Sequence, residues 1–95
     1  MPFLLELPPP WRERGWKLKI RDRERAEVPH VTVLYKRTAW RFGLRTPGPL
    51  DSEPDPTLVP AEILSEIDTH LDELRAAWDQ MYPENPITSD EDDDG

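Results

Sequence analysis

Residues 16–21 read WKLKIR, so apolar and basic side chains alternate without interruption. The apolar side chains are Trp16, Leu18 and Ile20, and the basic ones are Lys17, Lys19 and Arg21. A period of two is the pattern of a strand that buries one face. The stretch therefore predicts a half-buried strand with an apolar inner face and a basic outer face.

Two further stretches have the same period. In residues 28–36 the two faces carry Val31, Val33 and Tyr35 against His30, Thr32, Leu34 and Lys36. In residues 39–45 they carry Trp40, Phe42 and Leu44 against Ala39, Arg41, Gly43 and Arg45. Residues 36–38 leave room only for a tight turn, so these strands run antiparallel. We predict an antiparallel meander of three strands, or of four if residues 3–7 form a short first strand.

A proline-rich linker and then a helical pattern follow the strands. Residues 46–56 contain four prolines and several acids, which predicts an extended crossover without regular structure. Beyond Pro60, apolar residues recur every three or four positions, at Ile63, Ile67, Leu71, Leu74, Trp78 and Met81. This spacing predicts one long C-terminal helix that ends before Pro83 and covers the inner face of the meander. The predicted fold class is therefore α+β, a three- to four-stranded antiparallel meander packed on one long C-terminal helix.

The two ends of the chain differ from its middle. Residues 1–13 are predicted to form a proline-rich N-terminal arm, because neither a helix nor a central strand is expected to pass through three consecutive prolines at 8–10. Residues 14–83 form the single α+β domain. Residues 84–95 are predicted to be a disordered acidic tail, since residues 90–94 are five consecutive acids. The charged residues 21–27 are expected to form a solvated turn or a frayed helical turn.

Composition excludes several classes of protein. The chain has 95 residues, which leaves room for one small domain. No stretch approaches the roughly 20 apolar residues of a membrane-spanning helix, so no membrane partner is expected. The absence of cysteine excludes disulfide scaffolds, cysteine-based zinc sites and cysteine nucleophiles. Because the first residues also lack the basic flank of a secretory signal, we expect a cytoplasmic protein.

Charge is divided unevenly along the sequence. The formal net charge is −8, but residues 1–50 carry eleven basic and five acidic side chains, whereas residues 51–95 carry one basic and fifteen acidic ones. The halves thus have net charges of +6 and −14. Either the two halves attract each other on folding, or a basic surface meets a polyanion while the acidic tail tunes that contact.

Few residues have the chemistry of a catalytic site. The only histidines are His30 and His70, neither has a second histidine at metal-ligand spacing, and no glycine-rich phosphate loop is present. Carboxylate pairs such as Glu62 with Glu66 fall on the polar side of the helical pattern, which is typical of a solvated face. We therefore expect no metal, no cofactor and no catalytic residues. His30 is either structural or a general base or phosphate contact beside neighbouring cations.

The strongest functional signal is the basic outer face of the meander. The candidate residues for binding nucleic acid or a protein partner are Lys17, Lys19, Arg21, His30, Lys36, Arg37, Arg41 and Arg45. Such a face can follow a phosphate backbone, or it can simply be solvated. The aromatic residues Trp16, Tyr35, Trp40 and Phe42 fall on the opposite face, so we expect no platform where bases stack among the charges.

The order of these features resembles a known family. Residues 29–33 read PHVTV, residues 39–42 read AWRF, and a proline-rich acidic crossover leads to a helix with Ala77 and Trp78 near its end. Over about residues 15–82 the chain is similar to the small bacterial proteins of domain of unknown function four-one-six-zero. Members usually have a second histidine two residues after the Pro-His pair, where this chain has Thr32. The resemblance implies a compact strand-then-helix domain, often found in small operons that include toxin–antitoxin-like ones, with no agreed activity.

These observations favour a small, non-enzymatic protein-interaction module of a bacterial cytoplasm, whose partner is another protein. The alternative is a nucleic-acid-binding protein, or a toxin-like RNase that uses His30 with Lys36, Arg37 and Arg41. A third idea is that the acidic half mimics nucleic acid. A short sheet with an open edge also makes a homodimer a candidate assembly.

Overall fold

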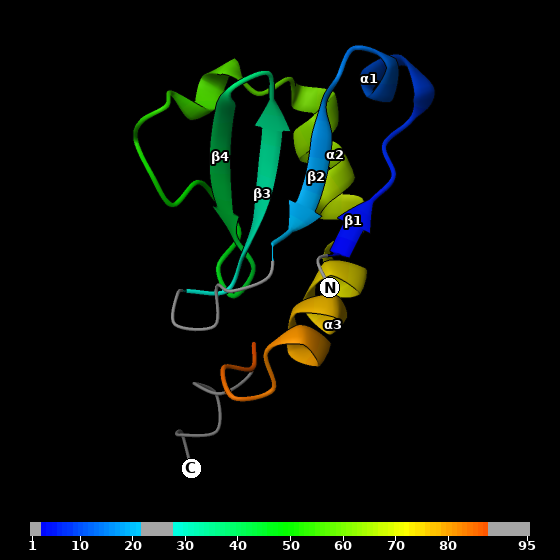
Figure 1. Ribbon diagram of the computed structural model, residues 1–95. Coiled ribbons are helices and arrows are strands. Elements are labelled where there is room, and N and C mark those ends of the chain that lie inside the picture. The colour runs from blue at the N-terminus through cyan, green and yellow to red at the C-terminus, as the bar shows by residue number, and fades with distance from the viewer. Residues whose placement is uncertain (1–2, 22–27, 88–95) are drawn as a thin grey trace.

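The computed structural model describes residues 3–21 and 28–87. It is an α+β arrangement of a four-stranded sheet and helices (Figure 1). The elements in chain order are β1 (Phe3–Leu5), α1 (Pro9–Glu13), β2 (Lys17–Ile20), β3 (His30–Tyr35), β4 (Thr38–Gly43), the 3-10 helix η1 (Pro56–Leu58), α2 (Ala61–Thr69) and α3 (Leu71–Met81).

The sheet is the predicted antiparallel meander, and it includes the fourth strand at the N-terminus. Its order is β1-β2-β3-β4, and every neighbouring pair is antiparallel. The register places Leu18 opposite Val33, and Val33 opposite Trp40. One residue further along, Lys19 lies opposite Thr32, and Thr32 opposite Arg41. Because side chains alternate between the faces of a strand, the first row is on the inner face and the second on the outer face.

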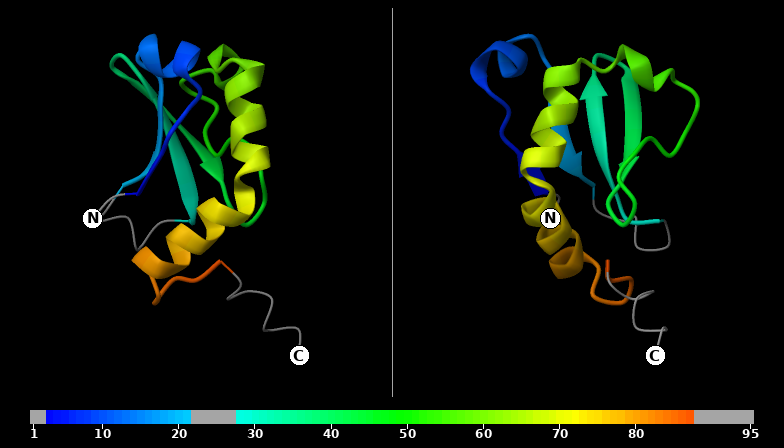
Figure 2. Two further views of the ribbon diagram at one scale, coloured as in Figure 1. Left: turned by 90° about the vertical axis from the view of Figure 1, so that its right-hand side faces the viewer. Right: turned by 180° about the vertical axis from the view of Figure 1, so that it is seen from behind.

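The apolar inner face forms the core together with the helices. Leu18, Ile20, Val31 and Val33 are fully buried, as are Ile63 on α2 and Trp78 on α3. Figure 2 shows α2 lying along this face of the sheet. Burial of each such side chain stabilises the fold by about 1.5–3 kcal/mol, which explains why both periodic patterns persist over their whole length.

The prediction of one long C-terminal helix was wrong, because the helix is broken at His70. That residue has φ −105° and ψ 22°, outside the helical region, and it separates α2 from α3. A straight helix over residues 61–81 would be about 31 Å long, whereas strands of six residues span about 20 Å. The break turns α3 across the end of the sheet, where Leu74 and Trp78 become buried (Figure 2).

The proline run contains the start of a helix, contrary to the prediction. Pro9 and Pro10 occupy the first turn of α1, where no backbone donor is needed and the φ angle of proline suits a helix. The segment before it packs on the rest of the protein. β1 pairs with β2, and the side chains of Leu5 and Leu7 lie in the core.

The segment after α3 is described as far as Ile87 and contacts the rest of the protein. Residues 84–87 fold back on the sheet end, and Ile87 is buried. The indole of Trp78 donates to the carbonyl of Asn85 at 2.7 Å. The predictions for residues 88–95, and for the charged segment 22–27, lie outside the described residues. In the part of the chain that is described, no helix is both long and apolar enough to cross a membrane.

Candidate binding site

The eight basic candidates of the sheet do not form one open surface. Lys17, Lys19 and Arg41 do share the outer face, as the register requires. Lys36 and Arg37 form the two-residue turn between β3 and β4, and Arg21 follows β2. Their surroundings differ so much that each has to be considered by its contacts.

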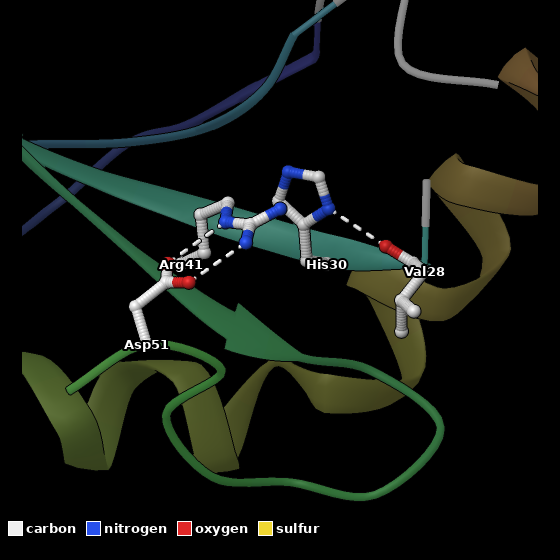
Figure 3. A network of polar contacts seen from close by, with 4 residues as sticks. All are labelled: Val28, His30, Arg41 and Asp51. Carbon is white, nitrogen blue, oxygen red and sulfur yellow. Dashed lines mark hydrogen bonds and ion pairs between the residues drawn. The ribbon is translucent and has the colours of Figure 1, made fainter. Parts of the chain in front are cut away.

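Arg41 forms an ion pair with the crossover. Its Nε donates to Asp51 Oδ2 at 2.9 Å and its Nη2 to Oδ1 at 2.8 Å, a two-pronged contact (Figure 3). The hydrogen bond from Arg41, and the positive charge near it, hold the pKa of Asp51 below its usual value. A guanidinium that already binds a carboxylate with two hydrogen bonds has little left to offer a phosphate.

Arg45 and Arg21 also have structural contacts. The guanidinium of Arg45 donates to the carbonyls of Ile87 and Pro86 at 3.1 and 2.7 Å, and to Asn85 Oδ1 at 3.2 Å. The backbone carbonyl of Arg21 accepts a hydrogen bond from the hydroxyl of Tyr82, a contact that does not involve the guanidinium. Arg45 therefore secures the segment after α3, and the end of β2 is joined to the end of the helix.

His30 is inside the protein. Its Nδ1 lies 2.7 Å from the carbonyl of Val28 (Figure 3). The ring is fully buried, and its centroid is 5.7 Å from that of Trp78. Thr32, on the same outer face, is also buried. These two residues of the outer face are therefore closed to solvent, and His30 is not presented to a ligand.

Lys17 and Lys36 come together near α1 and the turn between β3 and β4, at the upper end of the sheet in Figure 1. A pocket of about 420 Å³ lies there, and we call it the cationic pocket; its lining residues are Arg14, Gly15, Lys17, Leu34, Tyr35 and Lys36. Arg14 comes from the end of α1, Lys17 from the start of β2, and Lys36 from the turn after β3. The pocket thus combines two predicted site residues, Lys17 and Lys36, with one that sequence reasoning did not include.

Arg14 reaches this position because α1 ends abruptly. Gly15 follows with φ +99°, a left-handed conformation that glycine adopts without steric cost and that commonly ends helices. The chain then turns directly into β2. The sequence signal for this arrangement is the Arg-Gly pair just before a strand, because glycine often follows the end of a helix. The prediction for residues 1–13 contains no helix, so it does not use this signal.

Two cations lie close to aromatic rings at this end, whereas Trp16, Trp40 and Phe42 are buried. The ammonium of Lys36 is 5.2 Å from the ring centroid of Tyr35, and the guanidinium of Arg14 is 5.2 Å from that of Trp11. Lys36 has φ 54°, a left-handed backbone unusual for a residue with a side chain. In that conformation the alternation of the strand no longer applies, and the lysine lies over its neighbour.

The three cations of the pocket have no acidic partner within residues 3–21 and 28–87. The ion pairs described there join Arg12 to Glu6, Arg41 to Asp51, and His70 to two glutamates of its own helices. No group of three potential metal ligands is found in the same residues. The site can therefore attract and hold an anion.

The fold and the site define a small α+β protein with a cationic pocket at one end of its sheet. Comparisons with known proteins return no match: no family model, no curated protein and no solved structure is similar to this chain. The resemblance to domain of unknown function four-one-six-zero stays a prediction.

Proposed function

We propose that this chain is a non-enzymatic interaction module that binds an acidic segment of another protein at the cationic pocket. One observation carries the proposal: Arg14, Lys17 and Lys36 surround a pocket and have no acidic partner among the described residues. The other arginines of the sheet, Arg41 and Arg45, already bind groups of the protein itself. A partner would therefore meet three cations together at this pocket.

Electrostatics sets the expected strength and behaviour of this contact. An exposed ion pair contributes about 0.2–1 kcal/mol, so three cations acting together give modest affinity and rapid, steered association. Salt weakens such contacts, because the Debye length shortens from about 10 Å at 0.1 M to about 3 Å at 1 M.

A titration with a labelled acidic peptide tests the proposal. The test variant is K17Q with K36Q, and the matched control is K19Q with R37Q, which removes the same charge from neighbouring positions that do not line the pocket. We expect the test variant to lose roughly five- to tenfold in affinity and the control less than twofold. Equal losses in the two variants would show that only net charge matters and would refute a specific site.

Binding of single-stranded nucleic acid is the second candidate function. The observation that favours it is the pair of rings, Tyr35 and Trp11, that lie beside Lys36 and Arg14, since bases stack on aromatic side chains near cations. Labelled RNA in place of the peptide distinguishes the two: tight, salt-dependent RNA binding without peptide binding would replace our proposal. The RNase form of this candidate has less support, because it needs His30 at the surface and the ring is buried.

A further inference from the structure

A second pocket adjoins the cationic pocket. It has a volume of about 330 Å³, and we call it the aromatic pocket; its lining residues are Trp16, Tyr35, Lys36, Thr38, Trp40 and Leu58. Trp16 stacks on Tyr35 with ring centroids 4.2 Å apart and on Trp40 at 5.7 Å. Rings already stacked on one another leave less free surface for a nucleobase, but their edges form an apolar wall for an aliphatic or aromatic side chain.

Leu58 forms the rim of this pocket and is held there although 63% of it is exposed. Its 3-10 helix is capped by Asp55, whose Oδ1 accepts from the amide and the hydroxyl of Thr57 at 3.0 and 2.8 Å. The carbonyl of Asp55 in turn accepts from the indole of Trp40 at 3.0 Å. Asp55 therefore connects the turn that carries Leu58 to Trp40 in the aromatic pocket. These contacts hold the exposed side chain of Leu58 beside that pocket.

The two pockets share Tyr35 and Lys36. A ligand that fills both must accordingly carry its negative charge next to its apolar group. Lys36 lines both pockets and has the left-handed backbone that the first position of a two-residue hairpin turn favours. The volume of the aromatic pocket is at the lower end of the range for ligand pockets, about 300–1,000 Å³, which suits one side chain.

We propose that the ligand is an acidic peptide segment with one bulky apolar anchor, a leucine or phenylalanine, next to its carboxylates. The anchor enters the aromatic pocket beside Leu58, and the carboxylates bind Lys36, Lys17 and Arg14. Charge complementarity selects this occupant over an uncharged apolar segment. The inference rests on the function proposed above and specifies the chemistry of the partner.

The test uses the full chain and two labelled peptides of equal length and charge, one with a central leucine among aspartates and one with alanine in its place. We expect the leucine peptide to bind about tenfold more tightly, and its binding to change the tryptophan fluorescence. L58A should reduce this preference to about threefold or less. L4A is the matched control, because Leu4 is 61% exposed, almost as much as Leu58, and lies outside the aromatic pocket; it should leave the preference unchanged.

Each other outcome contradicts a different statement. If both peptides bind equally and K17Q with K36Q weakens both, the acidic-segment function stands and the anchor is refuted. If L4A lowers the preference as much as L58A does, the anchor does not use the aromatic pocket. If neither peptide binds, the anchor and the proposed function fail together, and RNA binding by the same chain would then identify a nucleic acid as the occupant.

Discussion

Lys36 has an unfavourable left-handed backbone conformation, and its side chain lines both proposed binding pockets. A left-handed residue with a side chain costs about 1–2 kcal/mol, and glycine avoids that cost but loses about 0.5–1 kcal/mol through its freedom in the unfolded chain. We therefore expect K36G to leave stability unchanged or to raise it by up to about 1 kcal/mol, while it weakens acidic-peptide binding severalfold. Thermal unfolding and peptide titration measure the two effects.

The neighbouring turn residue supplies the control for K36G. Arg37 does not have a positive φ angle, so R37G gains nothing in the folded state and should lower stability. A K36G protein that is clearly less stable than wild type would show that the lysine side chain is needed for the turn itself. Its position beside Tyr35 would then be structural rather than functional.

Asp51 couples stability to pH at the outer face. Its pKa is lowered by the hydrogen bond and charge of Arg41, so the pair stabilises the fold above the ordinary aspartate pKa of about 3.9. That contribution is lost as pH falls through the lower pKa of the folded state. Since the two side chains are 38% and 33% exposed, D51N should cost only about 0.5–1 kcal/mol at pH 7. Urea unfolding should show a much smaller difference near pH 2.5, and an equal difference at both pH values would exclude the ion pair as its cause.

Arg45 joins two elements that are distant in the sequence, β4 and the segment after α3. Its guanidinium binds Asn85, Pro86 and Ile87, and the carbonyl of Asn85 is also the acceptor for Trp78. R45M keeps a long apolar stem but removes these donors. We expect a loss of about 1–3 kcal/mol in denaturant unfolding and faster amide exchange in residues 85–87, with little effect on the cationic pocket. R37M, at an exposed turn position, should do neither; equal stability of R45M and R37M would contradict the role of Arg45.

The sequence predicts the elements of this fold better than their junctions. Alternation in WKLKIR and its neighbours is a local signal that predicts the meander and its two faces. The three- or four-residue spacing of apolar residues from Ile63 to Met81 is a second local signal, and it predicts helix. The break at His70 depends on the length of the sheet beneath the helix, which no local pattern contains. The partners of Arg41 and Arg45 lie 10 and about 40 residues away along the sequence. Local patterns therefore do not distinguish these two arginines from the cations that line the pocket. Arg14 was missed because a helix that begins with prolines was not expected.

At the scale of the whole molecule, a local positive site belongs to a negative protein. The chain carries a net charge of −8, and its second half supplies fifteen of the twenty acids. An acidic partner is therefore attracted by the cationic pocket and repelled by the rest of the protein. Salt screens the long-range repulsion once the Debye length is shorter than the distance between the partner and the acidic residues of the protein. Contacts between charges inside the pocket are screened less.

Residues 90–94 provide the means to change this balance without touching the pocket. Replacing their four aspartates with asparagine and Glu91 with glutamine lowers the net negative charge from −8 to −3 at constant length. We expect the affinity for the acidic peptide to rise severalfold at 0.1 M salt and much less at 1 M, where the Debye length is about 3 Å. The same replacement in the K17Q, K36Q variant should raise the affinity less. In that variant the cationic pocket binds the peptide weakly, so removing acids that compete with or repel the peptide has less effect. Equal gains in the two backgrounds would mean that the acids act on the ligand through net charge alone, and no gain in either would show that residues 90–94 do not regulate the cationic pocket.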